Sequence, residues 1–104
     1  MRTIEFRKPF TFEGKEYNNI VLDLDSLTGR DLIKAEAESR VIAGPSPSPM
    51  TEFSKPYNAV VAAKAAKVPV DLILNLPARD FTSVTVTVQD FLFGMDLIGE
   101  DAQK

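Results

Sequence analysis

The stretch FTSVTVTVQDFLFG, residues 81–94, constrains the fold more than any other, because its pattern fits two kinds of secondary structure. Its valines alternate with serine and threonine, which is the pattern of a half-buried strand. At helical spacing the apolar residues instead form one stripe of a helix. The members of that stripe are Phe81, Val84, Val88, Phe91 and Leu92.

The residues around this stretch favour the helix. Pro77 suits the first turn of a helix, Asp80 follows it closely, and Gly94 suits a helix end. A strand of this length would need partner strands that the rest of the sequence hardly provides. Because valine and threonine are weak helix formers, we expect tertiary packing to stabilise this helix.

Residues 3–24 have the pattern of a β-hairpin. In the first strand, four apolar residues share one parity and therefore point to one face, and the segment EGK at 13–15 supplies a flexible tip. Pro9 cannot donate a ladder hydrogen bond, so we expect this strand to be an edge strand or to be paired on one side only. The four apolar residues are Ile4, Phe6, Phe10 and Phe12.

The second strand of this hairpin contains a conflict of register. Ile20, Leu22 and Leu24 share one parity, whereas Tyr17 has the other. A two-residue turn at Gly14 and Lys15 would leave these three residues facing away from the phenylalanines of the first strand. We therefore expect either a bulge near residues 18–19 or a three-residue loop.

Two further helices are predicted between the hairpin and residue 77. The first covers residues 28–44, with Thr28 as N-cap, Asp31 three residues later and Gly44 at the end. Its apolar residues occupy two neighbouring faces. The second covers residues 54–68, is rich in alanine, and is expected to pack internally. Pro69 ends it and opens a short turn.

The predicted fold class is α+β, mainly α, with an N-terminal hairpin followed by three to four helices. We expect a single domain over residues 1–104, with the hairpin at 1–25 and the helical part at 26–94. Prolines at 45, 47 and 49 predict an extended spacer at 44–53. The last residues, 95–104, are expected to fray.

Charge and hydropathy exclude several kinds of partner. The formal net charge is −3, from 12 basic and 15 acidic side chains, which provides no basic field for nucleic acid or anionic lipid. The chain has no apolar run near the roughly 20 residues that cross a bilayer, and its N-terminus lacks the apolar core of a signal peptide. We therefore expect a cytoplasmic protein that binds neither nucleic acid nor membrane.

The composition also argues against an enzyme. Cysteine and histidine are both absent, which removes the best nucleophile, the commonest general base and the commonest nitrogen ligand of metals. A carboxylate or magnesium site at Asp23, Asp25 and Asp31 is the remaining catalytic alternative, although turn and capping roles explain each residue more simply. We expect no cofactor.

The order of several motifs resembles a known family. The segments KPFTFEGKEYNNIVLDLDSLTGRDLIKAEAE and SKPYNAVVAAKAAKVPVDLILNLPARDFTSVTVTVQDFL are similar to the phage tail assembly chaperones over about residues 8–92. The resemblance is to the branch that opens with a hairpin, continues with an LTGRDL helix start and closes on an LPARDF helix. No single motif is specific, so the co-linear set carries the resemblance.

This resemblance implies a non-catalytic function in the cytoplasm of the bacterial host. Members of the family bind the long tape measure protein and keep it soluble before tail-tube subunits polymerise around it. Many are also made in a longer frameshifted form that recruits the tail-tube protein. The alternative hypothesis is a structural component of the phage tail or connector.

A partner-binding surface is predicted at the C-terminal end of the last helix. Its apolar residues are more than one helix end can easily bury in a domain of this size, and phenylalanine with methionine makes an adaptable contact surface. Alternatively, Phe91 belongs to the core and the others fold back on the hairpin. The same surface would also suit a homo-oligomer. The predicted residues are Phe91, Phe93, Met95, Leu97 and Ile98.

Overall fold

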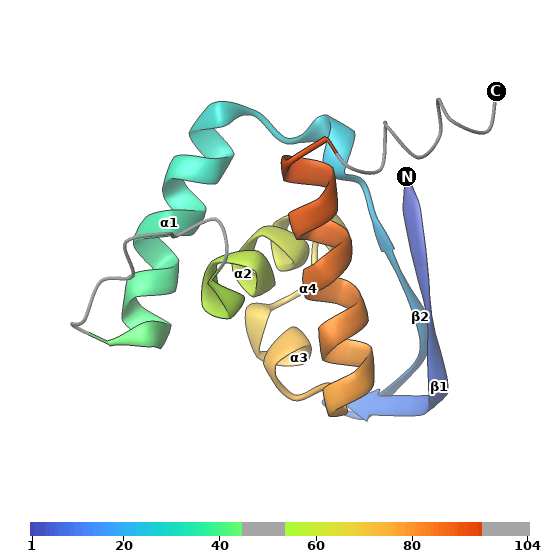
Figure 1. Ribbon diagram of the computed structural model, residues 1–104. Coiled ribbons are helices and arrows are strands. Elements are labelled where there is room, and N and C mark those ends of the chain that lie inside the picture. Colours follow the sequence, from blue (N-terminus) through green and yellow to red (C-terminus); the bar gives the residue numbers. More distant parts are fainter. Residues whose placement is uncertain (45–53, 95–104) are drawn as a thin grey trace, which may run out of the picture.

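The computed structural model describes residues 1–44 and 54–94, and it shows a hairpin followed by helices (Figure 1). The predicted α+β, mainly α fold is confirmed. The predicted tail at 95–104 and all of the predicted spacer except Gly44 lie outside the described residues. The elements are β1 (Arg2–Phe12), β2 (Lys15–Leu22), the 3-10 helix η1 (Leu24–Ser26), α1 (Gly29–Ala43), α2 (Lys55–Ala66), α3 (Val70–Leu74) and α4 (Ala78–Leu92).

The hairpin has a two-residue turn at Glu13 and Gly14, one residue earlier than the turn considered from the sequence. Phe12 pairs with Lys15 on either side of it. Both turn residues have positive φ, 50° and 80°, which is a conformation that glycine adopts without strain. Of the two expected alternatives, the three-residue loop is therefore not the one found.

The register conflict is resolved by an irregularity in β1. Glu5 pairs with Asn19, and the next pair is Phe10 with Tyr17. Between these two pairs β1 contains residues 6–9, whereas β2 contains only Asn18. The expected bulge thus lies at the right level of the hairpin but in the other strand. Pro9 falls in this unpaired stretch of β1, where its missing N–H costs no ladder hydrogen bond. The apolar sets of both strands consequently pack against the core.

α1 begins with the capping box that the sequence predicts. The hydroxyl of Thr28 accepts a hydrogen bond from the Asp31 N–H at 3.4 Å, and the Asp31 carboxylate accepts one from the Thr28 N–H at 2.9 Å. Gly44 ends the helix with a φ of 88°. Only one face of α1 is buried, and Ala35 and Ser39 lie on that face.

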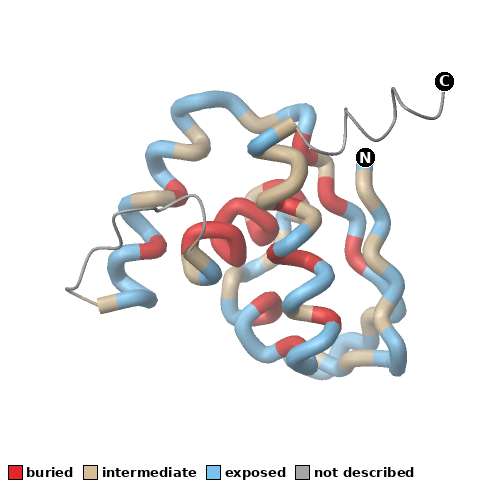
Figure 2. Tube along the Cα trace, in the orientation of Figure 1, coloured by how far each residue is buried: buried red, intermediate tan, exposed pale blue. Residues whose placement is uncertain are grey.

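α2 is the central helix of the molecule (Figure 1). All residues from Tyr57 to Ala63 are buried, which confirms the prediction of internal packing. Small alanine side chains allow the neighbouring elements to approach α2 closely from several sides. α1, α3, α4 and β2 all pack against it, so the core surrounds α2, as the buried residues in Figure 2 show.

The stretch that fitted both a strand and a helix, residues 81–94, is helical up to Leu92 and forms most of α4. Val84 and Val88 are fully buried, whereas Val86 is exposed, as one helical stripe requires. The hydroxyls of Thr82, Thr85 and Thr87 donate to carbonyl oxygens four residues earlier. α4 packs against α2 on one side and β1 on the other, so it joins the hairpin to the helical part.

Candidate binding surface

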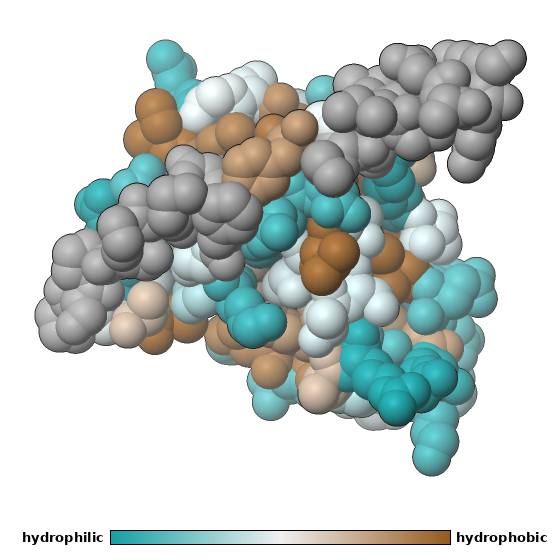
Figure 3. Space-filling model, viewed as in Figure 1, coloured by the Kyte–Doolittle hydropathy of each residue, from teal (hydrophilic) through white to brown (hydrophobic). Residues whose placement is uncertain are grey.

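An apolar groove lies where the beginning of α1, the beginning of α2 and the end of α4 meet. Its volume is about 290 Å³. Hydrophobic side chains, brown and tan in Figure 3, gather over the upper part of α1 and the adjoining end of α4. The groove is lined by Leu32, Ile33, Glu36, Tyr57 and Leu92.

Each wall of the groove is positioned by a helix end. The capping box at Thr28 fixes the first turn of α1, and Leu32 and Ile33 follow it directly. Ser54 caps α2 by accepting a hydrogen bond from the Tyr57 N–H at 3.3 Å. Leu92 is the last residue of α4. Three separate helix termini therefore converge on one apolar surface.

The site residues predicted from the sequence differ in burial. Phe91 is partly buried and packs against the core, as the alternative hypothesis proposed. Phe93, next to the groove residue Leu92, has 44% of its surface exposed. Met95, Leu97 and Ile98 lie outside the described residues, so their prediction stays open.

Sequence reasoning missed the contribution of α1 to this surface. Ile33 is 71% exposed and Val41 is 86% exposed, although both are large apolar side chains. The signal was present, because the apolar residues of α1 occupy two neighbouring faces of the helix. One buried stripe uses only one of those faces, which leaves the other to solvent.

The three aspartates considered as a metal site make separate contacts, two through their carboxylates and Asp23 through its backbone. Asp31 belongs to the capping box, Asp25 lies 4.0 Å from the N-terminal ammonium, and the Asp23 N–H donates to the Ala65 carbonyl at 3.1 Å. Among residues 1–44 and 54–94 no group of three or more acidic side chains is placed to hold a metal ion.

The pKa of Asp31 is lowered from its usual value, mainly because its carboxylate accepts a hydrogen bond from the Thr28 backbone N–H. Loss of hydration at this site raises the pKa and opposes the effect. The Thr28 hydroxyl and the charges of Lys64 and Lys34 lower it further. The shift is thus explained by helix capping.

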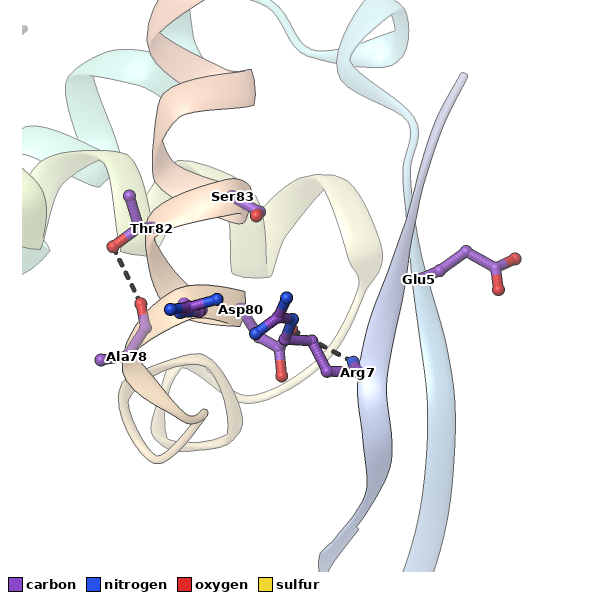
Figure 4. A pocket seen from close by; sticks show the side chains of 7 residues that line it. Glu5, Arg7, Ala78, Asp80, Thr82 and Ser83 are labelled. Atoms are coloured by element: carbon purple, nitrogen blue, oxygen red, sulfur yellow. Dashed lines mark hydrogen bonds between the residues drawn. The ribbon is translucent and has the colours of Figure 1, made fainter.

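A second hollow, most of whose lining residues are polar or charged, lies between β1 and the start of α4. Its volume is about 520 Å³. Figure 4 shows Arg7 and Asp80 facing each other across it, while Glu5 points away. The buried Asp80 carboxylate accepts a hydrogen bond from the Arg7 N–H at 3.4 Å. This contact uses a backbone donor in the irregular stretch of β1, so it ties the hairpin to α4.

Together these features define the class of protein as a small α+β fold whose candidate site is a groove between helix ends, lined mainly by apolar residues. Such surfaces are typical of sites that bind other proteins. None of the helices in the described part of the chain is both long and apolar enough to cross a membrane.

The chain belongs to the phage tail assembly chaperone family. The family described as "Phage tail assembly chaperone proteins, E, or 41 or 14" matches residues 3–92. No curated protein and no solved structure gave a match. All five groove residues lie inside the matched segment, whereas Phe93 lies one residue beyond it.

Proposed function

We propose that this protein binds the tape measure protein of its phage and keeps it soluble during tail assembly. The observation that carries the proposal is the family match over residues 3–92, because family membership implies a role in tail assembly. We further propose that the protein acts without catalysis, in the cytoplasm of the bacterial host, and is released before the tail is complete.

The groove supports this proposal on physical grounds. A long helical protein that waits for its tube exposes apolar stripes, and covering such stripes suppresses aggregation. An amphipathic helix laid into an apolar groove is a common mode of recognition. Leu32 and Leu92 line the walls of the groove, and the exposed Ile33 lies at its rim, where it would contact a bound helix.

We assign the contact with the tape measure protein to the groove together with Phe93. Phe93 follows Leu92 directly and presents an aromatic side chain, a type enriched in protein interfaces. Met95, Leu97 and Ile98 continue the same apolar sequence and remain part of the proposed surface.

A homo-oligomer would present several such surfaces to one long partner. A longer frameshifted form would add contacts to the tail-tube protein.

Co-expression with the tape measure protein from the same gene cluster tests the proposal. We expect the tape measure protein to stay soluble and to be recovered in a pull-down with this chain. Phe93→Asp should reduce both, because a carboxylate at an apolar contact must lose its hydration. Val21→Asp is the matched control, since Val21 is 42% exposed and lies on the hairpin.

Two results would contradict the proposal. The first is precipitation of the tape measure protein without complex formation, although this chain is folded and present in excess. The second is an equal loss of binding in the Phe93 and Val21 variants, which would point to a general effect of the added charge. Circular dichroism of both variants shows whether they keep the helical fold.

A further inference from the structure

The hollow between β1 and the start of α4 is lined by cations from both elements. Arg7 and Lys8 belong to the irregular stretch of β1, and Arg79 lies in the first turn of α4. All three residues are exposed. The hollow of about 520 Å³ adjoins one of about 690 Å³ that is also lined by Arg7 and Arg79. Both volumes fall in the range of cavities that bind ligands.

The carboxylates of the lining compensate only part of this positive charge. Glu5 points away from the hollow (Figure 4). Asp80 is 4% exposed, and its carboxylate accepts a hydrogen bond from the backbone N–H of Arg7 at 3.4 Å. Within residues 1–44 and 54–94, no carboxylate lies within ion-pair distance of Arg7, Lys8 or Arg79. Three cations therefore meet two carboxylates in the lining, and one of the two is turned away.

The chemical types of the lining residues suit carboxylate groups as ligands. A guanidinium group donates two parallel hydrogen bonds to one carboxylate, a geometry that lysine does not provide. Because Arg7 and Arg79 come from different elements, they reach a ligand in the hollow from two sides. Ser83 also lines the hollow and carries a hydroxyl that can donate a further hydrogen bond.

The charge of the whole chain favours a short ligand over a long polyanion. The net charge is −3, which repels an extended nucleic acid. A short acidic segment responds mainly to the charges within roughly 10 Å, because salt screens the more distant ones. The local cations of the hollow therefore decide its binding.

We propose that this hollow binds a segment of a partner protein that carries clustered aspartate or glutamate side chains. The carboxylates of the segment pair with Arg7 and Arg79, and Lys8 adds attraction without a fixed geometry. This binding site goes beyond the proposed function, since none of the groove residues lines the hollow.

Two short peptides test the proposal with the full chain. One carries several glutamates among glycine and serine residues, and its twin carries glutamine at the same positions. Fluorescence anisotropy at low salt should show roughly tenfold tighter binding of the glutamate peptide, because a few exposed ion pairs contribute modestly. Added salt should reduce this preference. Changes in amide NMR shifts on binding should be concentrated at residues 7–8 and 78–83.

Charge variants locate the binding. The double variant Arg7→Gln, Arg79→Gln should bind the glutamate peptide roughly tenfold more weakly, so that the preference disappears. The backbone N–H that bonds Asp80 is retained in this variant. The matched control is Arg30→Gln, Lys34→Gln, which removes the same charge from exposed positions of α1 and should leave the affinity nearly unchanged. Circular dichroism shows whether both variants keep the helical fold.

Several outcomes would overturn the proposal. Equal binding of the two peptides, or amide shift changes away from the hollow, would show that it is not a carboxylate site. Equal loss of affinity in the two double variants would indicate a general charge effect. An oligonucleotide of equal net charge that competes with the glutamate peptide and binds as tightly would make phosphate the ligand.

Two further results concern the nature of the partner. A concentration-dependent dimer that the Arg7→Gln, Arg79→Gln variant abolishes would make a second copy the occupant and overturn the proposal. The peptide experiment is independent of the tape measure test. Binding of the glutamate peptide together with failure to solubilise the tape measure protein would support this site and overturn the proposed function.

Discussion

At the scale of single residues, local chemistry explains most of the polar contacts. The carboxylate of Asp31 satisfies the N–H of Thr28 at the start of α1, and this hydrogen bond lowers its pKa. Asn58 is the exception. It is 2% exposed, and its side-chain oxygen has no hydrogen-bond partner in the structure as described. A buried polar atom without a partner destabilises the native state.

The lowered pKa of Asp31 predicts a pH dependence of stability. Since the pKa in the folded state lies below the usual 3.8, the ionised carboxylate stabilises the fold above that value and ceases to do so as the pH falls through the folded-state pKa. Thermal unfolding of the native protein and Asp31→Asn at neutral and acidic pH measures this. We expect a difference in Tm near pH 7 that shrinks below about pH 3.8. A difference that stays constant across this range would contradict the prediction.

The unpaired side-chain oxygen of Asn58 leads us to expect that truncation of this side chain has little effect on the free energy of unfolding. Asn58→Ala removes the unpaired oxygen, so it should change the free energy of unfolding by less than about 0.5 kcal/mol or increase it. Val61→Ala, one turn later and equally buried, should decrease it by about 1 to 3 kcal/mol. Urea denaturation compares the two variants. Equal destabilisation by both would show that Asn58 makes a favourable contact.

At the scale of elements, α1 and α4 form helices for different reasons. α1 has a capping box, a terminal glycine and a Glu36–Arg40 ion pair, all of which are local. α4 contains five valine and threonine residues in succession, 84–88, and these are weak helix formers. Its helix is stabilised by burial of Val84 and Val88 against the rest of the chain.

This difference predicts the behaviour of isolated peptides. A peptide of residues 77–94 should be mostly unstructured in water, because the burial that stabilises α4 is absent. A peptide of residues 27–44 should show more helix, since its cap and ion pair are included. Circular dichroism at equal concentration compares them. A peptide 77–94 at least as helical as its counterpart would show that local sequence determines α4.

At the scale of the whole molecule, the fold surrounds one buried helix, α2, with α1, α3, α4 and β2. α4 also packs against β1, whereas α1 buries only one side and exposes the other. The groove and the exposed apolar stripe of α1, formed by Ile33, Ala37 and Val41, are both products of this arrangement. They adjoin at Ile33, which borders the groove and begins the stripe.

The proposed function also predicts the composition of the finished particle. A chaperone that leaves before completion of the tail should be absent or present only in trace amounts in purified phage particles. Mass spectrometry of such particles, with the tail-tube protein as internal reference, measures this. Recovery in a fixed ratio to the tail-tube protein would instead support the structural component of the tail or connector.

The sequence predicted the elements well, whereas the partner-binding residues that it indicates stay a prediction. The hairpin, the helix starts at Thr28 and Ser54 and the helical state of residues 81–92 follow from prolines, caps and periodicity, and the structure confirms them. Of the predicted site residues, Phe91 packs against the core and Phe93 is exposed. That division depends on which neighbours lie beside the helix end, and periodicity does not contain this information.

The sequence by itself determined the order and kind of the elements, because turns, caps and prolines act over a few residues. The tertiary structure decided which faces are buried. The hairpin needs an irregularity because both apolar sets must reach the core together, and the tertiary structure has its extra residues in β1. Likewise, α2 covers only one of the two apolar faces of α1, so Ile33 and Val41 remain exposed. Burial depends on contacts between distant segments, which local patterns do not specify.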